Sequence, residues 1–186
     1  MPQSPISAVI AAALVLHTGM SAAQENTIED WSWIVDHYEQ AGQWISSCDH
    51  RNDNGIKLSR CYISLVDVFA PRPQFGAAFV FVTAPTPASL RYEFRFEPGT
   101  VFAADGFALI RDGKPVWHLD TATCPDLKCV IEAGAAQTLA SQMSREGELR
   151  IVFSDTHGRT WERRWPNAGF AAMLVDFRVA LTQRGL

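Results

Sequence analysis

Hydrophobic and polar positions alternate through much of the middle of this 186-residue chain. In Leu90–Phe96, apolar and charged residues take turns, which is typical of a strand with one buried and one solvent-facing side. Phe75–Thr83 is mostly apolar, which favours a strand buried on both sides. The pattern predicts strands at Trp44–Cys48, Arg60–Phe69, Phe75–Thr83, Leu90–Phe96, Val101–Phe102, Phe107–Ile110, Pro115–Leu119, Glu148–Phe153 and Arg159–Trp165.

Turn residues separate several of these segments. Asp112-Gly113 predicts a tight hairpin, and Asp155–Gly158 predicts a second one. The polar stretch Asp49–Lys57 predicts a loop. These signals fit antiparallel strands that are joined by short connections.

Three segments have helical periodicity instead. In Ile28–Gln40, apolar residues fall on one side at helical spacing, and Asn26 and Thr27 are good capping residues. Ala133–Met143 and Ala168–Leu181 follow the same period, and Phe170 lies on the apolar side of the last segment. The last two are expected to pack against the strands.

Together, these elements predict a mainly β fold: an antiparallel β-sandwich-like single domain with two packed helices. We expect a signal peptide at residues 1–23, an N-terminal helical segment at 24–43 and a disulfide-stapled β-sandwich-like domain at 44–186.

The first residues resemble an export signal. Ile6–Leu16 is almost wholly apolar, and Ser21-Ala22-Ala23 resembles a cleavage site. The apolar run is too short for a membrane span of roughly 20 residues. It lacks a preceding Lys or Arg, so retention as an uncleaved anchor is the alternative. We therefore expect a bacterial protein that is periplasmic or secreted, with no transmembrane span after cleavage.

The formal net charge is -4, with acidic and basic residues interspersed. This composition gives no basic stripe for nucleic acid and no polybasic run for an anionic membrane. The sequence also has no glycine-rich phosphate loop. We expect no nucleic-acid partner and no cofactor.

Four cysteines in an exported chain predict two disulfides. Three pairings are open, and we favour Cys48 with Cys61 and Cys124 with Cys129, because each pair brackets turn-forming residues. The alternative is a zinc site formed by Cys124, Cys129 and His118. An oxidising compartment and the lack of a second ligand pair argue against it, so we expect no metal site.

No catalytic residues are predicted. Ser154, Asp155 and His157 are adjacent in a turn, so their side chains would not converge as a triad requires. The carboxylates Glu93, Glu97 and Asp120 lie near Arg91, Arg95 and Arg111 in the sequence, which favours cross-strand ion pairing over glycoside chemistry.

One segment suggests a binding face. Trp161, Arg163 and Trp165 alternate along a predicted strand and so share one side. This mixture of aromatic and cationic side chains fits a glycan or a protein partner. The alternative is an arginine stacked on tryptophan beside the core.

The order of several motifs resembles the invasion-associated locus B family of bacterial exported proteins. The matching features run from about Trp44 to Ala180: Trp44 before Cys48, Cys61 at a strand, Leu90 with Pro98-Gly99, Gly106 with Ala108-Leu109 and Asp112-Gly113, Thr123-Cys124 with Cys129, the helix to Met143, Gly158, and Gly169-Phe170. The chain departs from the family at Glu97, at Lys128, at Pro166-Asn167 and in a longer Asp67–Pro73 region.

The resemblance implies a β-sandwich-like domain, export, and a role in host-cell entry or in the envelope. It implies no established catalytic residues. We therefore expect a non-enzymatic protein that binds an envelope or host-surface protein or glycan. The alternatives are an envelope hydrolase, which needs a concave pocket of convergent titratable groups, and a structural or chaperone-like periplasmic factor, which an exposed apolar sheet edge or groove would favour.

Overall fold

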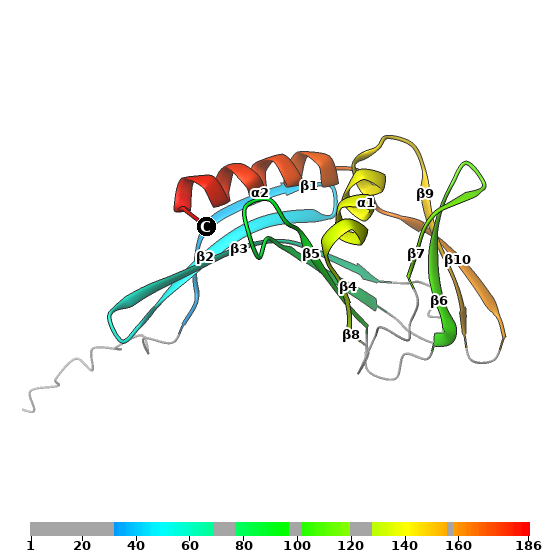
Figure 1. Ribbon diagram of the computed structural model, residues 1–186, viewed down its shortest axis with the longest axis horizontal. Helices are drawn as coiled ribbons and strands as arrows, with labels where there is room; N and C mark the ends of the chain where they lie inside the picture. Colours follow the sequence, from blue (N-terminus) through cyan, green and yellow to red (C-terminus); the bar gives the residue numbers. More distant parts are fainter. Residues whose placement is uncertain (1–31, 69–76, 97–101, 120–127, 156–157) are drawn as a thin grey trace, which may run out of the picture.

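The structure is a computed structural model, which describes residues 32–68, 77–96, 102–119, 128–155 and 158–186. Within these residues, ten strands form two antiparallel sheets, and two α-helices pack with them (Figure 1). This architecture confirms the predicted mainly β, sandwich-like fold with two helices. The expected signal peptide, residues 1–23, lies outside the described residues and stays a prediction.

Sheet A contains six strands in the order β1-β2-β3-β4-β5-β8, and sheet B contains four in the order β10-β9-β6-β7. The strands of sheet A are β1 Ile34–Ala41, β2 Trp44–Asp53, β3 Ile56–Val68, β4 Ala77–Thr83, β5 Arg91–Phe96 and β8 Lys128–Ile131. The strands of sheet B are β6 Phe102–Arg111, β7 Lys114–Leu119, β9 Leu149–Asp155 and β10 Thr160–Trp165, and the helices are α1 Ala133–Ser144 and α2 Phe170–Arg184.

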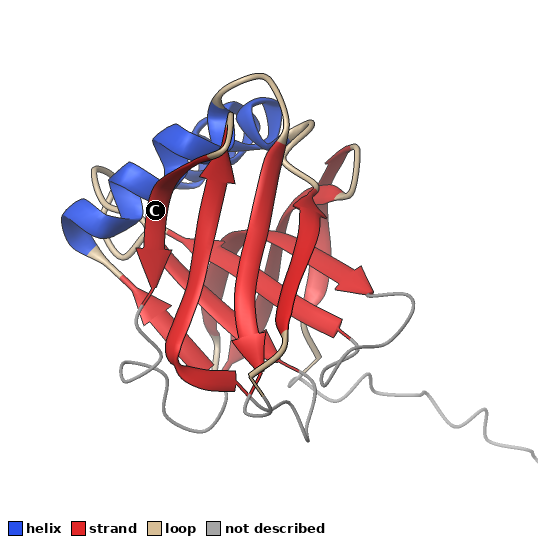
Figure 2. Cartoon of the chain, turned by 90° about the vertical axis from the view of Figure 1, so that its right-hand side faces the viewer, coloured by secondary structure: helices blue, strands red, loops and turns tan. Residues whose placement is uncertain are grey.

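The core lies on one side of sheet A, where α2 and sheet B both pack. The ring of Phe170, from α2, lies 4.9 Å from that of Trp44. The ring of Phe94, from β5, lies 5.5 Å from Phe107 and 6.0 Å from Trp165, both from sheet B. Figure 1 shows α2 running along β1 and β2, and Figure 2 shows the strands of sheet B crossing those of sheet A behind them. Aromatic contacts therefore join all three layers.

The side chains of β4 alternate between buried and partly exposed, which shows that only one side of sheet A is buried. In β4, Ala78, Val80 and Val82 are at most 1% exposed, whereas Phe79 and Phe81 between them are only half-buried. The expectation that this strand is buried on both sides is wrong. In the described part of the chain, α2 and sheet B cover the same side, so the alternate phenylalanines face outward.

The helix predicted over Ile28–Gln40 is also wrong for its described part. Ile34–Ala41 forms the edge strand β1, paired antiparallel with β2 across a turn at Gly42. Its residues Ile34, Val35 and Tyr38 are 51%, 56% and 55% exposed, so their spacing marks no buried side. Pairing with an existing strand satisfies backbone hydrogen bonds, whereas a short isolated helix has a costly nucleus.

The predicted loop Asp49–Lys57 is mostly strand. β2 and β3 form a long hairpin whose turn is only Asn54-Gly55, with φ of 51° and 83°. Two positive φ values are characteristic of a type I′ turn, whose twist matches the flanking strands. The polar residues on either side therefore continue the ladder.

The remaining elements follow the sequence pattern, except that one strand, β6, runs through the region where two short strands were predicted at Val101–Phe102 and Phe107–Ile110. Both packed helices are present, and Phe170, Phe177 and Leu174 of α2 are buried as expected. The strand β8 was not predicted, because four residues give too short a pattern to recognise. It pairs with β5 and forms the second edge of sheet A.

Candidate functional site

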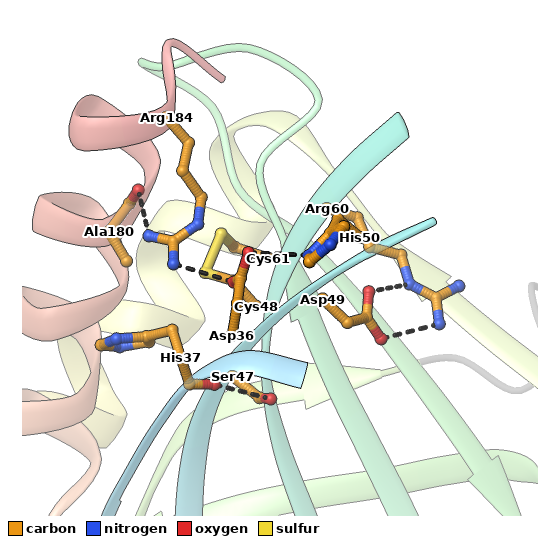
Figure 3. Close-up of polar contacts among 10 residues, drawn as sticks. All are labelled: Asp36, His37, Ser47, Cys48, Asp49, His50, Arg60, Cys61, Ala180 and Arg184. Carbon is orange, nitrogen blue, oxygen red and sulfur yellow. Dashed lines mark hydrogen bonds and ion pairs between the residues drawn. A yellow bond between two sulfur atoms is a disulfide. The ribbon is translucent and has the colours of Figure 1, made fainter. Parts of the chain in front are cut away.

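The first predicted disulfide is present. Cys48 and Cys61 lie directly opposite each other in the β2–β3 hairpin and are bonded, with their Cα atoms 4.0 Å apart (Figure 3). Cys129 is also disulfide-bonded, and Cys124 lies outside the described residues. Local pairing is therefore confirmed for Cys48 with Cys61. A bonded Cys129 offers no thiolate to zinc, which removes the alternative with His118, and the described residues contain no other group of potential metal ligands.

The predicted binding face is turned largely toward the core. Trp161, Arg163 and Trp165 do lie on one side of β10, but Trp165 is 1% exposed and packs against Phe94. Trp161 packs partly against the core, and the guanidinium of Arg159 lies 5.5 Å from its ring centre. Trp165 is thus unavailable to a ligand, which favours the alternative interpretation of arginine and tryptophan beside the core.

The residues weighed as catalytic do not converge within the described structure. Glu93 forms ion pairs with Arg95 of its own strand and with Lys128 of the neighbouring β8, so its cross-strand partner is a lysine that was not among the expected arginines. His157, Glu97 and Asp120 lie outside the described residues. Arg111, a predicted ion-pair partner, is instead buried against the end of α1.

A different surface carries the candidate site, on the side of sheet A opposite the core. We call it the outer face. Its valines Val66 and Val68 are 51% and 64% exposed. It consists of the outward-pointing residues of β3 (Arg60, Tyr62, Ser64, Val66 and Val68), β4 (Phe79, Phe81 and Thr83) and β5 (Arg91, Glu93 and Arg95).

At one end of the outer face, aromatic and guanidinium groups stack. The guanidinium carbon of Arg60 lies 3.7 Å from the ring centre of Trp33 and 5.8 Å from that of Tyr62. Arg51 approaches the same tryptophan at 5.0 Å. The ring of Tyr62 in turn meets that of Phe81 edge-on, with centroids 6.2 Å apart. These cation–π and aromatic contacts fix the side chains in place.

Asp49 holds the central arginine of this stack. Its two carboxylate oxygens accept from Nε and Nη2 of Arg60 at 2.7 and 3.0 Å, a two-pronged pair between neighbouring strands (Figure 3). Asp49 is 3% exposed, and the hydrogen bond to it raises the pKa of Arg60 above its ordinary value. The planar pairing orients the guanidinium toward the aromatic rings.

Next to this stack, the outer face is hollowed. A shallow cavity of about 390 Å³ lies elsewhere at the start of α2, but the one on this face, of about 330 Å³, combines aromatic and charged walls. It is lined by Arg60, Tyr62, Phe81, Thr83, Arg91, Glu93 and Arg95. Three arginines, two aromatic rings and a carboxylate therefore meet over three neighbouring strands.

The carboxylate in this hollow is held ionised. Burial alone would raise the pKa of Glu93, but hydrogen bonds from Lys128 and Arg95 lower it below its ordinary value. The Lys128 Nζ lies 2.8 Å from the carboxylate. A carboxylate fixed in this way is a poor proton donor near neutral pH, whereas it is well suited to holding cationic side chains in position.

The outer face was not identified from the sequence, although its signal is visible there. The alternation of Leu90–Phe96 already places Arg91, Glu93 and Arg95 on one side. Only strand pairing brings them beside Phe79 and Phe81 of β4. The order of strands in the sheet cannot be read from alternation, so the neighbours remained unknown.

Polar contacts fasten α2 to the other side of the same sheet. His37 Nε2 lies 2.7 Å from Asp176. Asp36 bridges His50 and Arg184 at 2.9 Å each (Figure 3). The hydrogen bond from Arg184 lowers the pKa of Asp36. This network secures the layer beneath the outer face.

Comparison with solved structures finds the crystal structure of invasion associated protein B from Bartonella henselae. The match has a TM-score of 0.55 and 14% sequence identity, and it covers 79% of this chain and 99% of that one. At this identity the likeness shows a shared fold. No family model matches the chain, and no curated protein matches it.

Proposed function

We propose that this protein is an exported, non-enzymatic binding protein of the bacterial cell envelope or host interface, with a role linked to host-cell invasion. The observation that carries the proposal is the outer face of sheet A, which the described layers leave open. We assign it, in place of the Trp161 face, as the binding surface.

The composition of the outer face supports binding to another macromolecule. Tyrosine, tryptophan and arginine are enriched among the residues that contribute most to protein interfaces. Here Trp33, Arg60, Tyr62 and Arg91 lie on or beside one open surface, with exposed valines next to them. Ion pairs and stacking hold several of these side chains before a partner arrives, which reduces the entropy lost on binding.

The electrostatics of the hollow favour binding over catalysis. A general acid or base needs a pKa near the working pH. Glu93 is instead kept ionised by the hydrogen bonds from Lys128 and Arg95, which lower its pKa. This supports a surface that recognises charge rather than one that moves protons.

The disulfide and the fold support export and an envelope role. A buried disulfide such as Cys48–Cys61 persists in oxidising compartments, including the periplasm and the cell exterior. No described helix has the length and apolar character of a membrane span. The shared fold with invasion associated protein B supports the proposed link to invasion.

Site-specific photo-crosslinking in cells tests the proposal. A photoreactive residue replaces Val66 on the outer face or, as the control, Val175 on α2, which is 65% exposed. Both valines are surface positions, so both variants should fold. We expect a discrete crosslinked product from position 66 only, in the periplasmic or secreted fraction.

The crosslink must also depend on the face itself. Introducing Tyr62→Ala into the Val66 variant should abolish the product, whereas Glu162→Gln on sheet B should not. A product that forms equally from positions 66 and 175, or a protein retained in the cytoplasm, would contradict the proposal.

A second candidate function is a chaperone-like periplasmic factor, favoured by one observation. Among the described strands β1 is an edge of sheet A, and its residues Ile34 and Val35 are exposed; an edge with apolar residues can pair with an extended chain. Suppression of aggregation of a reduced model substrate, lost on Val35→Lys but kept on Tyr62→Ala, would favour this candidate over the outer face.

A further inference from the structure

We infer that the ligand of the outer face is a protein partner that presents carboxylates around an apolar centre. The inference rests on the proposed function and adds the chemistry of the partner. It comes from the arrangement of charged and apolar rows across β3, β4 and β5, and from the donor groups that the arginines still offer.

The rows are set by strand register. Val66 of β3 lies opposite Phe79 of β4, which lies opposite Arg95 of β5. One step along the sheet, Phe81 lies opposite Glu93. An apolar centre on β3 and β4 is therefore bordered by a charged row on β5.

Arg91 and Arg95, in the charged row, still offer the N–H donors of their terminal Nη groups. Arg91 uses Nε toward Glu132 at 3.3 Å, and Arg95 uses Nε toward Glu93. In the described part of the chain, neither arginine donates a hydrogen bond from its terminal Nη groups. Two adjacent N–H groups on a guanidinium form a fork that matches the two oxygens of a carboxylate.

The charged side chains on and beside the outer face have a net charge opposite in sign to that of the whole chain. Four cations, Arg60, Arg91, Arg95 and Lys128, meet three carboxylates, Asp49, Glu93 and Glu132. The chain as a whole has a formal charge of -4. These seven side chains therefore carry one net positive charge on an acidic protein, which favours an acidic partner over a basic one.

The exposed valine side chains of the outer face favour a protein ligand over a saccharide. A sugar ring would use the aromatic rings and the donors of the hollow, but it leaves Val66 and Val68 without a role. From Tyr62 to Val68 the face extends about 20 Å along β3, which suits a protein interface of ordinary size rather than a single ring. Exposed valines next to aromatic and arginine side chains match the apolar centre and polar rim of such interfaces.

Peptide selection tests the inference directly. A random-peptide display library is selected on the purified protein, and the enriched peptides are then measured on the double variant Arg91→Gln, Arg95→Gln. We expect the enriched peptides to carry Asp or Glu beside aromatic or branched apolar residues. Their Kd should rise by about ten- to a hundred-fold on the double variant, the range for hydrogen bonds to charged groups, and should also rise with salt.

The matched control removes two arginines from the outside of sheet B, Arg150→Gln with Arg164→Gln, and should leave binding unchanged. Thermal melting of both double variants checks that each is folded. Oligogalacturonate, a saccharide with a carboxylate on every ring, serves as the competing probe. The inference is overturned if that probe binds the outer face more tightly than the peptides, or if acidic peptides bind both double variants equally.

The outcomes separate this inference from the proposed function. Selected peptides that bind the outer face without acidic residues overturn the inference and leave the proposed function standing. If no peptide binds this face, the inference fails, and the Val66 crosslink then decides the proposed function on its own.

Discussion

The backbone of Gly169 lies directly against that of Ala41. A Cβ atom at Gly169 would be 2.2 Å from the Ala41 carbonyl oxygen, and Gly169 has a φ of 91°. This contact joins the end of β1 to the residue before α2. The close approach and the left-handed conformation both require glycine here.

Gly169→Ala should therefore destabilise the protein. The methyl group meets backbone atoms rather than a flexible side chain, so either β1 or the start of α2 must shift. We expect a loss of about 2–4 kcal/mol in the free energy of unfolding, the upper part of the range for single substitutions, measured by urea denaturation. Gly55→Ala is the control, because that glycine also has a positive φ, of 83°, but has open space around it. Equal losses for the two variants would mean that conformation alone matters.

Arg111 of β6 is a buried cation whose side chain caps the C-terminal end of helix α1. It is 6% exposed and donates from Nη1 to the Glu146 carbonyl and from Nη2 to the Gln142 carbonyl, at 2.5 and 2.7 Å. The carboxyl end of a helix carries partial negative charge, which compensates the guanidinium.

Arg111→Met keeps most of the apolar stem but leaves these carbonyls without their donors. We expect a loss of about 2–4 kcal/mol in the free energy of unfolding, because charged hydrogen bonds are removed in a buried site. Arg164→Met, at a side chain 78% exposed, should change stability by no more than about 0.5 kcal/mol. A neutral result for Arg111→Met would mean that desolvation of the guanidinium cancels its hydrogen bonds.

The Cys48–Cys61 bridge divides the long β2–β3 hairpin into a part under α2 and a projecting tip. Replacing both cysteines by alanine should cost about 3 kcal/mol, the loop-closure value for a short crosslinked loop. Amide hydrogen exchange should accelerate most from Asp49 to Arg60, beyond the bridge. Reduction of the unmodified protein should reproduce the change, and uniform acceleration across both sheets would show that the bridge stabilises the whole domain instead.

The sequence was most informative where alternation was long and where helices were amphipathic. Leu90–Phe96 and Ala168–Leu181 were placed correctly, because each has enough periods to distinguish strand from helix. The helix predicted over this part of the chain is wrong because the apolar residues of Ile34–Ala41 are exposed at a sheet edge. Their spacing therefore does not report a buried side. The outer face was missed for a different reason: it depends on which strands are neighbours, and that is decided by tertiary pairing.

Asp67 gives a pH-dependent prediction. It lies near the end of β3, where burial raises the pKa of its carboxyl group and the charge of Arg163 only partly offsets this. A raised pKa means that the folded state disfavours the charged form. The Asp67 carboxyl group therefore destabilises the folded state least below its unfolded pKa. The destabilisation grows as pH rises through its folded pKa.

Asp67→Asn removes this penalty, so the variant should melt at a higher temperature than the unmodified protein near pH 7. The difference should shrink near pH 3, where the carboxyl group is protonated in both states. Asp112→Asn removes the same charge from an exposed turn, and Asn-Gly keeps the turn chemistry, so this variant is the matched control for the loss of one carboxylate. Lower stability of Asp67→Asn at neutral pH would mean that attraction between Asp67 and Arg163 outweighs the cost of burial.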